Sequence, residues 1–295
     1  MGLRIRTNIS SLNAQRKLSE TTQKLSTNME KLAGGHRINK AADDAAGMGV
    51  SENLRAKLRS MAQAKRNASD GVSLIQVAEA GMNEVSNILI RLRELSTQAA
   101  SDTIGNRERS FANKEYMELV EEIDRIGNVT EFNGIRLLRG GNEEGSLEKL
   151  TLHVGRGDGS KPNHDTIDLN LGSLKIMSEE TFGITSENGI GPTDIHDDSF
   201  GRESAAEKLN VLDNALNLVN NMRAELGAKQ SRLNSTINNL SIAEENMSAS
   251  RSRIRDVDFA SETAKYTQNR ILQQGGASVL SQANAMPELA LTLLR

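Results

Sequence analysis

The order of apolar and polar positions near the N-terminus predicts a helix that needs a partner. Ile5, Ile9 and Leu12 lie at helical spacing. Leu18, Leu25 and Leu32 then recur every seven residues, and Met29 falls between the last two. A narrow apolar seam of this kind is typical of a helix that packs against another helix.

A second, much longer helix follows a break in this pattern. Gly34-Gly35 predicts the end of the first helix, and Asp43-Asp44 suit the first turn of the next, where the helix dipole favours acidic side chains. Apolar residues then keep three- or four-residue spacing over about residues 54 to 99, which predicts a helix roughly 70 Å long and therefore a rod. A shorter helix follows, with Tyr116, Leu119, Val120, Ile123 and Ile126 on its buried side.

The region from 127 to 200 has a different pattern. "LEKLTLHVG" and "DTIDLNLG" alternate apolar and polar residues, and a stretch rich in Gly, Asp, Pro and Asn separates them. This pattern predicts an antiparallel β-hairpin at about 147–172. We expect the residues from about 173 to 203 to form a short variable loop.

The helical period returns at about Ser204 and continues towards the C-terminus. The predicted seam contains apolar residues interrupted by Arg223, Gln230, Glu244 and Arg251, and polar seam residues favour one register over others. From Ile271 to Arg295, Glu288 and Arg295 are the only charged side chains. A terminal segment this apolar is expected to aggregate, enter a membrane or pack against a partner.

These elements together predict a mainly α fold. We expect a long antiparallel, coiled-coil-like helical rod with a small β-hairpin, in which both halves of the chain contribute to each domain. An inner terminal domain would combine 1–40 and 256–295, and a rod-like core domain would occupy 41–255. The connection between the halves is short, so no separate outer domain is expected.

Composition excludes several classes of function. The 295 residues include no cysteine, so disulfides, thiolate metal sites and a cysteine nucleophile are excluded. A net charge of −3 argues against nucleic-acid binding, and no run is apolar enough for membrane insertion. The four histidines, His36, His153, His164 and His196, lack metal-site spacing. We therefore expect no catalytic residue, metal or cofactor, and no cleavable signal peptide, because the N-terminus lacks an apolar segment.

Several motifs in the same order resemble bacterial flagellins. They are the opening at 8–14, "LAGGHRINKAADDAAGMGVSENLRA" at 32–56, "DGVSLIQVAEAGMNEV" at 70–85, "RLRELSTQAA" at 91–100, "EFNGIRLL" at 131–138 and the segment from Ser252 to the end. The resemblance covers about four-fifths of the chain. It implies a secreted structural subunit of the extracellular flagellar filament, serving motility, exported largely unfolded and assembled through its terminal helices.

The resemblance also implies functional residues and partners. The polymerisation surface would contain Ile5, Ile9, Leu12, Leu18, Leu25, Leu32, Ile271, Leu272, Val279, Leu280, Leu289, Leu293 and Leu294. The implied partners are further copies of the chain, an export chaperone at the C-terminal segment, and filament cap and hook-junction proteins. Arg91, Leu95 and Glu115 match positions read by an animal Toll-like receptor, although Ile90 replaces the usual Gln.

Two other functions remain open at this point. A hook–filament junction protein has similar termini, with a less complete match through the core helices. Another secreted coiled-coil protein would explain the long helices without explaining the motifs at both ends. An enzyme has no supporting constellation of residues.

Overall fold

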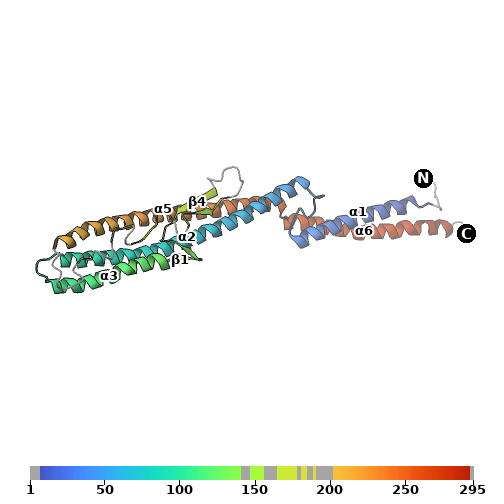
Figure 1. The fold of residues 1–295 in the computed structure, drawn as a ribbon. Helices are drawn as coiled ribbons and strands as arrows, with labels where there is room; N and C mark the ends of the chain where they lie inside the picture. Colours follow the sequence, from blue (N-terminus) through green and yellow to red (C-terminus); the bar gives the residue numbers. More distant parts are fainter. Residues whose placement is uncertain are drawn as a thin grey trace. The chain divides into compact units, whose positions relative to one another are not determined.

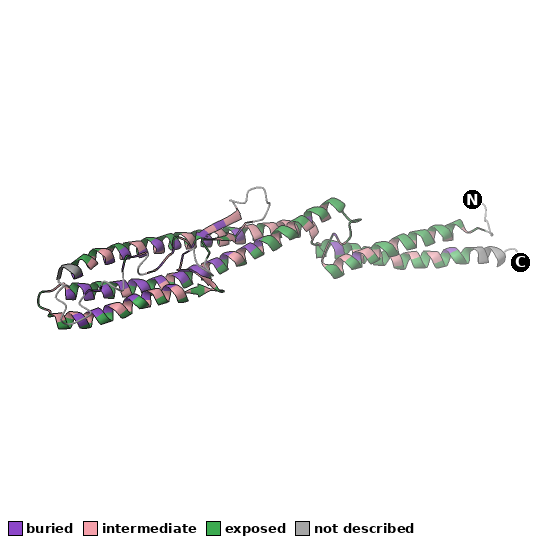
Figure 2. Cartoon of the chain, in the orientation of Figure 1, coloured by how far each residue is buried: buried purple, intermediate pink, exposed green. Residues whose placement is uncertain are grey.

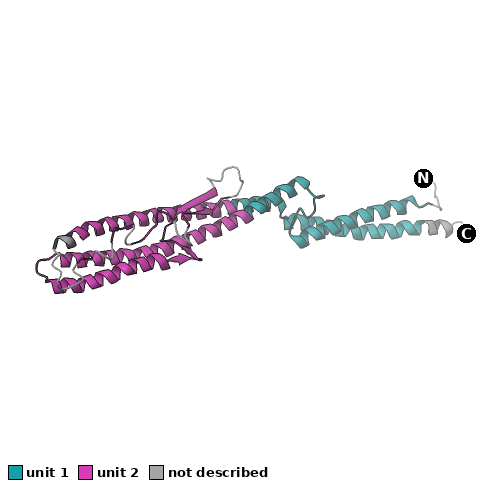
Figure 3. Ribbon diagram, in the orientation of Figure 1, with its two compact units in different colours: residues 1–58, 245–295 teal, residues 59–244 magenta. Residues whose placement is uncertain are grey.

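A computed structural model of the chain describes residues 7–140, 147–155, 165–177, 181–184, 189–190 and 202–292. The chain divides into two compact units. The terminal unit contains residues 1–58 and 245–295, and the core unit contains residues 59–244 (Figure 3). Each unit therefore combines chain segments that are far apart in sequence.

In the terminal unit, helices α1 (Ile9–Gly34) and α6 (Phe259–Thr292) lie side by side and antiparallel (Figure 1). We call them the terminal helix pair. The Asn8 side chain caps α1 by accepting a hydrogen bond from the Ser11 backbone N–H at 3.1 Å, and its Nδ2 donates to the Ala283 carbonyl of α6 at 2.7 Å. Gly35, at φ 66°, supplies the left-handed residue that ends α1.

Three helices build the core unit. They are α3 (Asn106–Val129), the greater part of α2 (Ala45–Ala99) and the greater part of α5 (Arg202–Arg255). Arg93 of α2 pairs with Asp213 of α5 at 2.6 Å, and Arg91 of α2 pairs with Glu115 of α3 at 2.7 Å. Between these helices lies one continuous apolar core, in which Met82, Leu89 and many neighbours are fully buried.

Two antiparallel strand pairs are present among the described residues. β1 (Glu131–Phe132) and β2 (Ile135–Arg136) are joined by Asn133 and Gly134, both at positive φ, as a tight Asn-Gly turn requires. β3 (Lys149–His153) pairs with β4 (Thr166–Asn170) over five residues each. Leu152 of β3 packs close to Gly71 of α2, so the hairpin sits on the core helices.

The predicted fold class is confirmed: the described chain is mainly helical, with long antiparallel helices and a small β-hairpin at the expected place. Two details were wrong. α2 begins at Ala45, well before the apolar spacing that starts at about 54, and Asp44 precedes its first turn rather than lying in it; the Asp44 Oδ1 accepts from the Gly47 N–H at 2.9 Å. Met29 does not lie in the α1 seam but is 54% exposed. The residue between Leu25 and Leu32 that faces inward is its neighbour Asn28, which is buried.

Candidate functional site

More polar than apolar residues are buried among the described residues of the terminal unit. In the described part of the terminal unit, Ile38 and Ala283 are the only buried apolar residues, whereas Asn28, Ser51 and Glu262 are buried polar ones. The leucines that face α6 from α1, Leu18, Leu25 and Leu32, are half-buried. The pair therefore removes little apolar surface from water when it forms, and its own contacts stabilise it only modestly.

One buried polar cluster crosses the pair. In the amide orientation that satisfies both of its atoms, Asn28 Nδ2 donates to Glu262 Oε1 at 3.1 Å and Asn28 Oδ1 accepts from Asn269 Nδ2 at 3.1 Å. The other carboxylate oxygen of Glu262 accepts from Lys265 Nζ at 3.2 Å. Both oxygens of the buried carboxylate are thus hydrogen-bonded, which a buried charge requires.

The exterior of the same pair carries large apolar side chains among its polar ones. Large apolar side chains that are more than half exposed follow both helices: Ile9, Leu12 and Met29 on α1, and Phe259, Ile271, Leu272, Val279 and Met286 on α6. Figure 2 shows the exposed class dominating α1 and α6, whereas the buried class follows the inner faces of the core-unit helices. Exposed apolar side chains that lie close together are typical of surfaces that bind a partner.

Two open grooves gather these apolar side chains. The first lies between the helices and is lined by Ala14 and Leu18 of α1 and by Ile271, Leu272 and Val279 of α6. The second runs along α6 from Phe259 to Leu272, so Ile271 and Leu272 line both. A helix laid into either groove would bury apolar side chains that water now contacts.

The residues predicted for polymerisation divide into two groups. Ile9, Leu12, Ile271, Leu272 and Val279 face outward and are exposed. Leu18, Leu25, Leu32 and Leu280 are half-buried. Ile5, Leu293 and Leu294 lie outside the described residues, as does the side chain of Leu289. Phe259 was missed by the sequence analysis, because it is the first residue of α6 and stands ahead of the apolar spacing.

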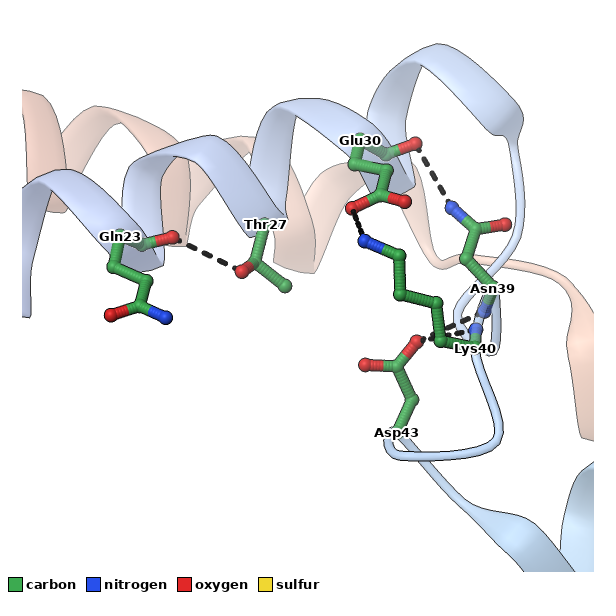
Figure 4. Close-up of polar contacts among 6 residues, drawn as sticks. All are labelled: Gln23, Thr27, Glu30, Asn39, Lys40 and Asp43. Atoms are coloured by element: carbon green, nitrogen blue, oxygen red, sulfur yellow. Dashed lines mark hydrogen bonds and ion pairs between the residues drawn. The ribbon is translucent and has the colours of Figure 1, made fainter.

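The segment between α1 and α2 is held by short-range polar contacts (Figure 4). The side chain of Asn39 donates to the Glu30 carbonyl at 3.2 Å, and Lys40 Nζ lies 2.9 Å from Glu30 Oε2. Asp43 Oδ2 accepts from the backbone N–H groups of Asn39 and Lys40, each at 3.0 Å. The Lys40 and then the Asn39 N–H hold the pKa of Asp43 below its usual value.

This segment also crosses the segment between α5 and α6. The Arg37 N–H donates to the Arg255 carbonyl at 2.6 Å, and the Val257 N–H donates to the Gly35 carbonyl at 3.1 Å. Arg255 Nη1 lies 2.8 Å from Glu52 Oε1, at the start of α2. The chain halves are therefore joined by backbone as well as side-chain bonds where they leave the terminal helix pair.

The residues matched to receptor recognition lie on the core unit. Arg91 contacts Glu115 at 2.7 Å and Glu94 at 3.0 Å, and hydrogen bonds to these two carboxylates raise the pKa of Arg91. All three side chains are exposed, and the neighbouring Ile90 is 48% exposed. Leu95 is different, because it is 2% exposed and packs in the core.

The described part of the chain offers no other site of obvious chemistry. Among these residues, no group of three or more His, Asp or Glu side chains is placed to hold a metal ion. No described helix is both long and apolar enough to cross a membrane. Burial raises the pKa of Tyr116 to about 12, which is consistent with a core residue rather than a reactive group.

Comparison with known proteins identifies both halves of the chain. Residues 5–143 match the bacterial flagellin N-terminal helical region, and residues 209–294 match the bacterial flagellin C-terminal helical region. Among solved structures, a putative flagellar hook-associated protein from Vibrio parahaemolyticus has a TM-score of 0.57 over 72% of this chain and 100% of its own. At 16% sequence identity, that likeness concerns the fold alone.

Curated relatives match along the whole chain. Flagellin FlaB2 of Treponema pallidum is 37% identical over 98% of both chains. The flagellar filament 33 kDa core protein of Treponema phagedenis is 38% identical over 98% of both, and flagellin of Bacillus subtilis is 38% identical over 99% of this chain and 100% of its own. With both terminal regions matched and the relatives aligned from end to end, the chain belongs to the bacterial flagellin family.

Proposed function

We propose that the terminal helix pair is the surface through which this chain polymerises. As a flagellin, the chain is a structural subunit of the bacterial flagellar filament, which serves motility. The single observation that supports the location of the surface is that the pair exposes large apolar side chains such as Ile271 and Leu272 while it buries Asn28 and Glu262. Neighbouring subunits would bury those apolar side chains and so stabilise helices that are marginal alone.

The proposed polymer consists of further copies of this chain. A heterologous contact that does not close on itself generates a helical fibre. In this arrangement, residues 1–40 and 256–295 form the assembly domain, residues 41–255 form the subunit core, and no outer domain is expected. The crossing at which Arg37 meets Arg255 lies at this proposed boundary, inside the terminal unit of residues 1–58 and 245–295.

Substitution of one groove residue tests this proposal. Ile271→Asp places a charge where both grooves meet, so seeded growth of fibres from purified chain should fall at least about tenfold, which corresponds to a binding free energy weakened by ~1.4 kcal/mol. Ala277→Asp is the matched control, because Ala277 is exposed on the same helix and is not among the residues that line the two grooves. Equal growth by both variants would contradict the proposed surface.

We further propose export of the largely unfolded chain to the cell exterior, with a chaperone bound to the C-terminal segment. The absence of cysteine means that no disulfide has to be broken for this. The few buried apolar side chains of the terminal unit also make α6 easy to open. Titration of the chain with a candidate chaperone should slow amide exchange within α6 alone, and protection confined to the core unit would contradict this.

Filament cap and hook-junction proteins are proposed to contact the same terminal helices. The fold shared with a putative hook-associated protein keeps a junction role as a second candidate. The two functions differ in the extent of self-assembly. A filament subunit grows long fibres from seeds without other proteins, whereas a junction protein stops after a short layer.

Recognition by an animal Toll-like receptor is a separate proposal that concerns the core unit. Arg91 and Glu115 form an exposed pair that a partner could contact, and buried Leu95 would position the helix beneath them. Arg91→Ala should weaken binding to the receptor ectodomain. Arg93→Ala is the matched control, because Arg93 is equally exposed but pairs with Asp213 of α5, and equal losses would count against a specific role for Arg91.

A further inference from the structure

We propose that Asn28, through Glu262 and Asn269, fixes the register in which α1 and α6 pair. This goes beyond the polymerisation surface itself and rests on the proposed function only for its consequence for assembly. All three residues are on the inner faces of the terminal helix pair, and the side chain of Glu262 is only 8% exposed.

Apolar packing alone does not select one register. Leu18, Leu25 and Leu32 are spaced by seven residues, so a slip of seven residues replaces each leucine by another over most of the helix. Thr21 lies on the same face, but its hydroxyl donates to the Lys17 carbonyl of its own helix at 2.9 Å. That bond is the same in every register of α1 against α6, so Thr21 does not favour one register. A discriminating contact has to cross between the helices.

The bond from Asn8 Nδ2 to the Ala283 carbonyl and the bond from the Val257 N–H to the Gly35 carbonyl cross at the two ends of the pair. The Asn28 cluster crosses between these ends, where Asn28 and Glu262 are buried. Asn28 Nδ2 donates to Glu262 Oε1, and Asn28 Oδ1 accepts from Asn269 Nδ2, both at 3.1 Å. Leu18 lies level with Gly276 across the antiparallel pair. Counting along both helices from this contact places Asn28 about one helical turn from Glu262 and one turn from Asn269. A slip of seven residues would bring Asn28 level with Gln273 or with Phe259, and in either case one of the two bonds would be broken.

Loss of the bond to Glu262 would be especially unfavourable. In the register that brings Asn28 level with Gln273, the Glu262 carboxylate would lose its bond to Asn28 and keep Lys265 as its partner, and a charged group gives up more than a neutral one when such a bond is lost. The native register also places Leu18 beside Ile271 and Val279 in the groove between the helices. We infer that the cluster determines which apolar side chains this groove presents to a neighbouring subunit.

Cross-linking measures the register directly, because the chain contains no native cysteine. Three double variants share Gly276→Cys, at a site where an added Cβ lies 3.4 Å from Leu18 Cδ1. Leu18→Cys reports the native register, and Leu25→Cys and Ser11→Cys report slips in the two directions. A short bifunctional thiol reagent is applied to the full-length chain, and intramolecular products are quantified by peptide mapping.

With Asn28 present, we expect the native pair to dominate. Asn28→Leu should raise the ratio of slipped to native product by about tenfold or more, since the buried bond no longer discriminates between registers. Thr21→Leu, the same kind of change on the same face, should leave the ratio unchanged. Glu262→Gln keeps an oxygen that accepts from Asn28 and should also retain the native register.

The outcomes separate this proposal from the polymerisation surface. An unchanged ratio for Asn28→Leu, with helix content maintained by circular dichroism, would overturn the register role whatever happens to fibre growth. An equal rise for Thr21→Leu would overturn it too. Failure of Ile271→Asp to slow fibre growth would remove the polymerisation surface and leave the cross-linking result intact.

Discussion

The two units of this chain use helices of similar kind for opposite purposes. The core unit buries Ile75, Met82, Leu89 and Ile123 completely between its helices. The terminal unit buries a polar cluster and leaves Ile271 and Val279 more than half exposed. Both are amphipathic helix assemblies, but the core unit buries its apolar side chains fully, whereas the leucines between α1 and α6 are only half-buried.

The difference shows how one chain separates folding from assembly. Burial of apolar area is the main favourable contribution to folding, so the core unit has a driving force of its own. The terminal helix pair has little of that contribution by itself, and under the proposed function a neighbouring subunit would supply the rest. Under the proposed function, the core unit would fold by itself and the terminal helices would be stabilised further on polymerisation.

Removal of the end of the chain is expected to have the largest effect. Deletion of Gln274–Arg295 removes more than half of α6, including Val279 of the groove between the helices, so seeded fibre growth should be abolished. The thermal unfolding transition of the core unit should persist, because none of its residues is removed. Electron microscopy and circular dichroism measure the two properties, and unchanged fibre growth would refute the role given to this segment.

Truncation of a single leucine should lower the free energy of unfolding more in the core unit than in the terminal unit. Leu89→Ala empties a fully buried position and should lower the free energy of unfolding of the core unit by about 2–5 kcal/mol. Leu25→Ala removes a half-buried side chain of α1 and should cost about 1 kcal/mol. Chemical denaturation followed by helix content tests both, and equal losses would contradict the contrast between the units.

Replacement of a glycine by alanine tests how densely the core unit and the terminal unit are packed. A Cβ at Gly127 of α3 would lie 2.5 Å from the Ile176 carbonyl oxygen, so Gly127→Ala should destabilise the core unit by about 1–3 kcal/mol. At Gly275 of α6, nothing lies within 4 Å of an added Cβ. Gly275→Ala should instead stabilise its helix by roughly 0.5–1 kcal/mol, and destabilisation by both changes would indicate equally dense packing.

The smallest effect is expected from the acid titration of Asp43 in the segment after α1. Its pKa in the folded chain is lowered from 3.8, so its contribution to stability is present above that value and is lost as the pH falls through the folded pKa. Asp43→Asn should remove this acid dependence. Amide exchange at Asn39 and Lys40, measured at neutral pH and near pH 3, should therefore change less in the variant than in the parent chain.

Much of the fold could be predicted because the helix-forming signals are local. The spacing of Leu18, Leu25 and Leu32, the break at Gly34-Gly35 and the alternation in the β-hairpin each depend on neighbours in sequence. The start of α2 at Ala45 was harder to predict from the spacing of apolar residues. Residues 45–53 contain two glycines and little apolar spacing, so the cap formed by Asp44 marks the start of α2 more clearly than the pattern does.

The candidate site was only partly predictable. The apolar character of Ile271, Leu272 and Val279 is plain in the sequence, but their exposure is not, because amphipathic spacing does not say which face meets a partner within the same chain. The inward position of Asn28 could have been predicted, because it lies three residues after Leu25 and four before Leu32 on the same helical face. Its partners, Glu262 and Asn269, are more than 200 residues away and could not be assigned from spacing.

The sequence by itself determined the helices, the hairpin, the absence of cysteine chemistry and the likeness to flagellins, since these depend on residue type and local order. Only the tertiary structure decided that the terminal helices bury Asn28 and Glu262 between half-buried leucines and leave Ile271 and Val279 exposed. The reason is physical: a helix has several faces, and long-range packing selects the one that becomes the interior. In the core unit that selection favoured leucine, and between α1 and α6 it favoured Asn28 and Glu262.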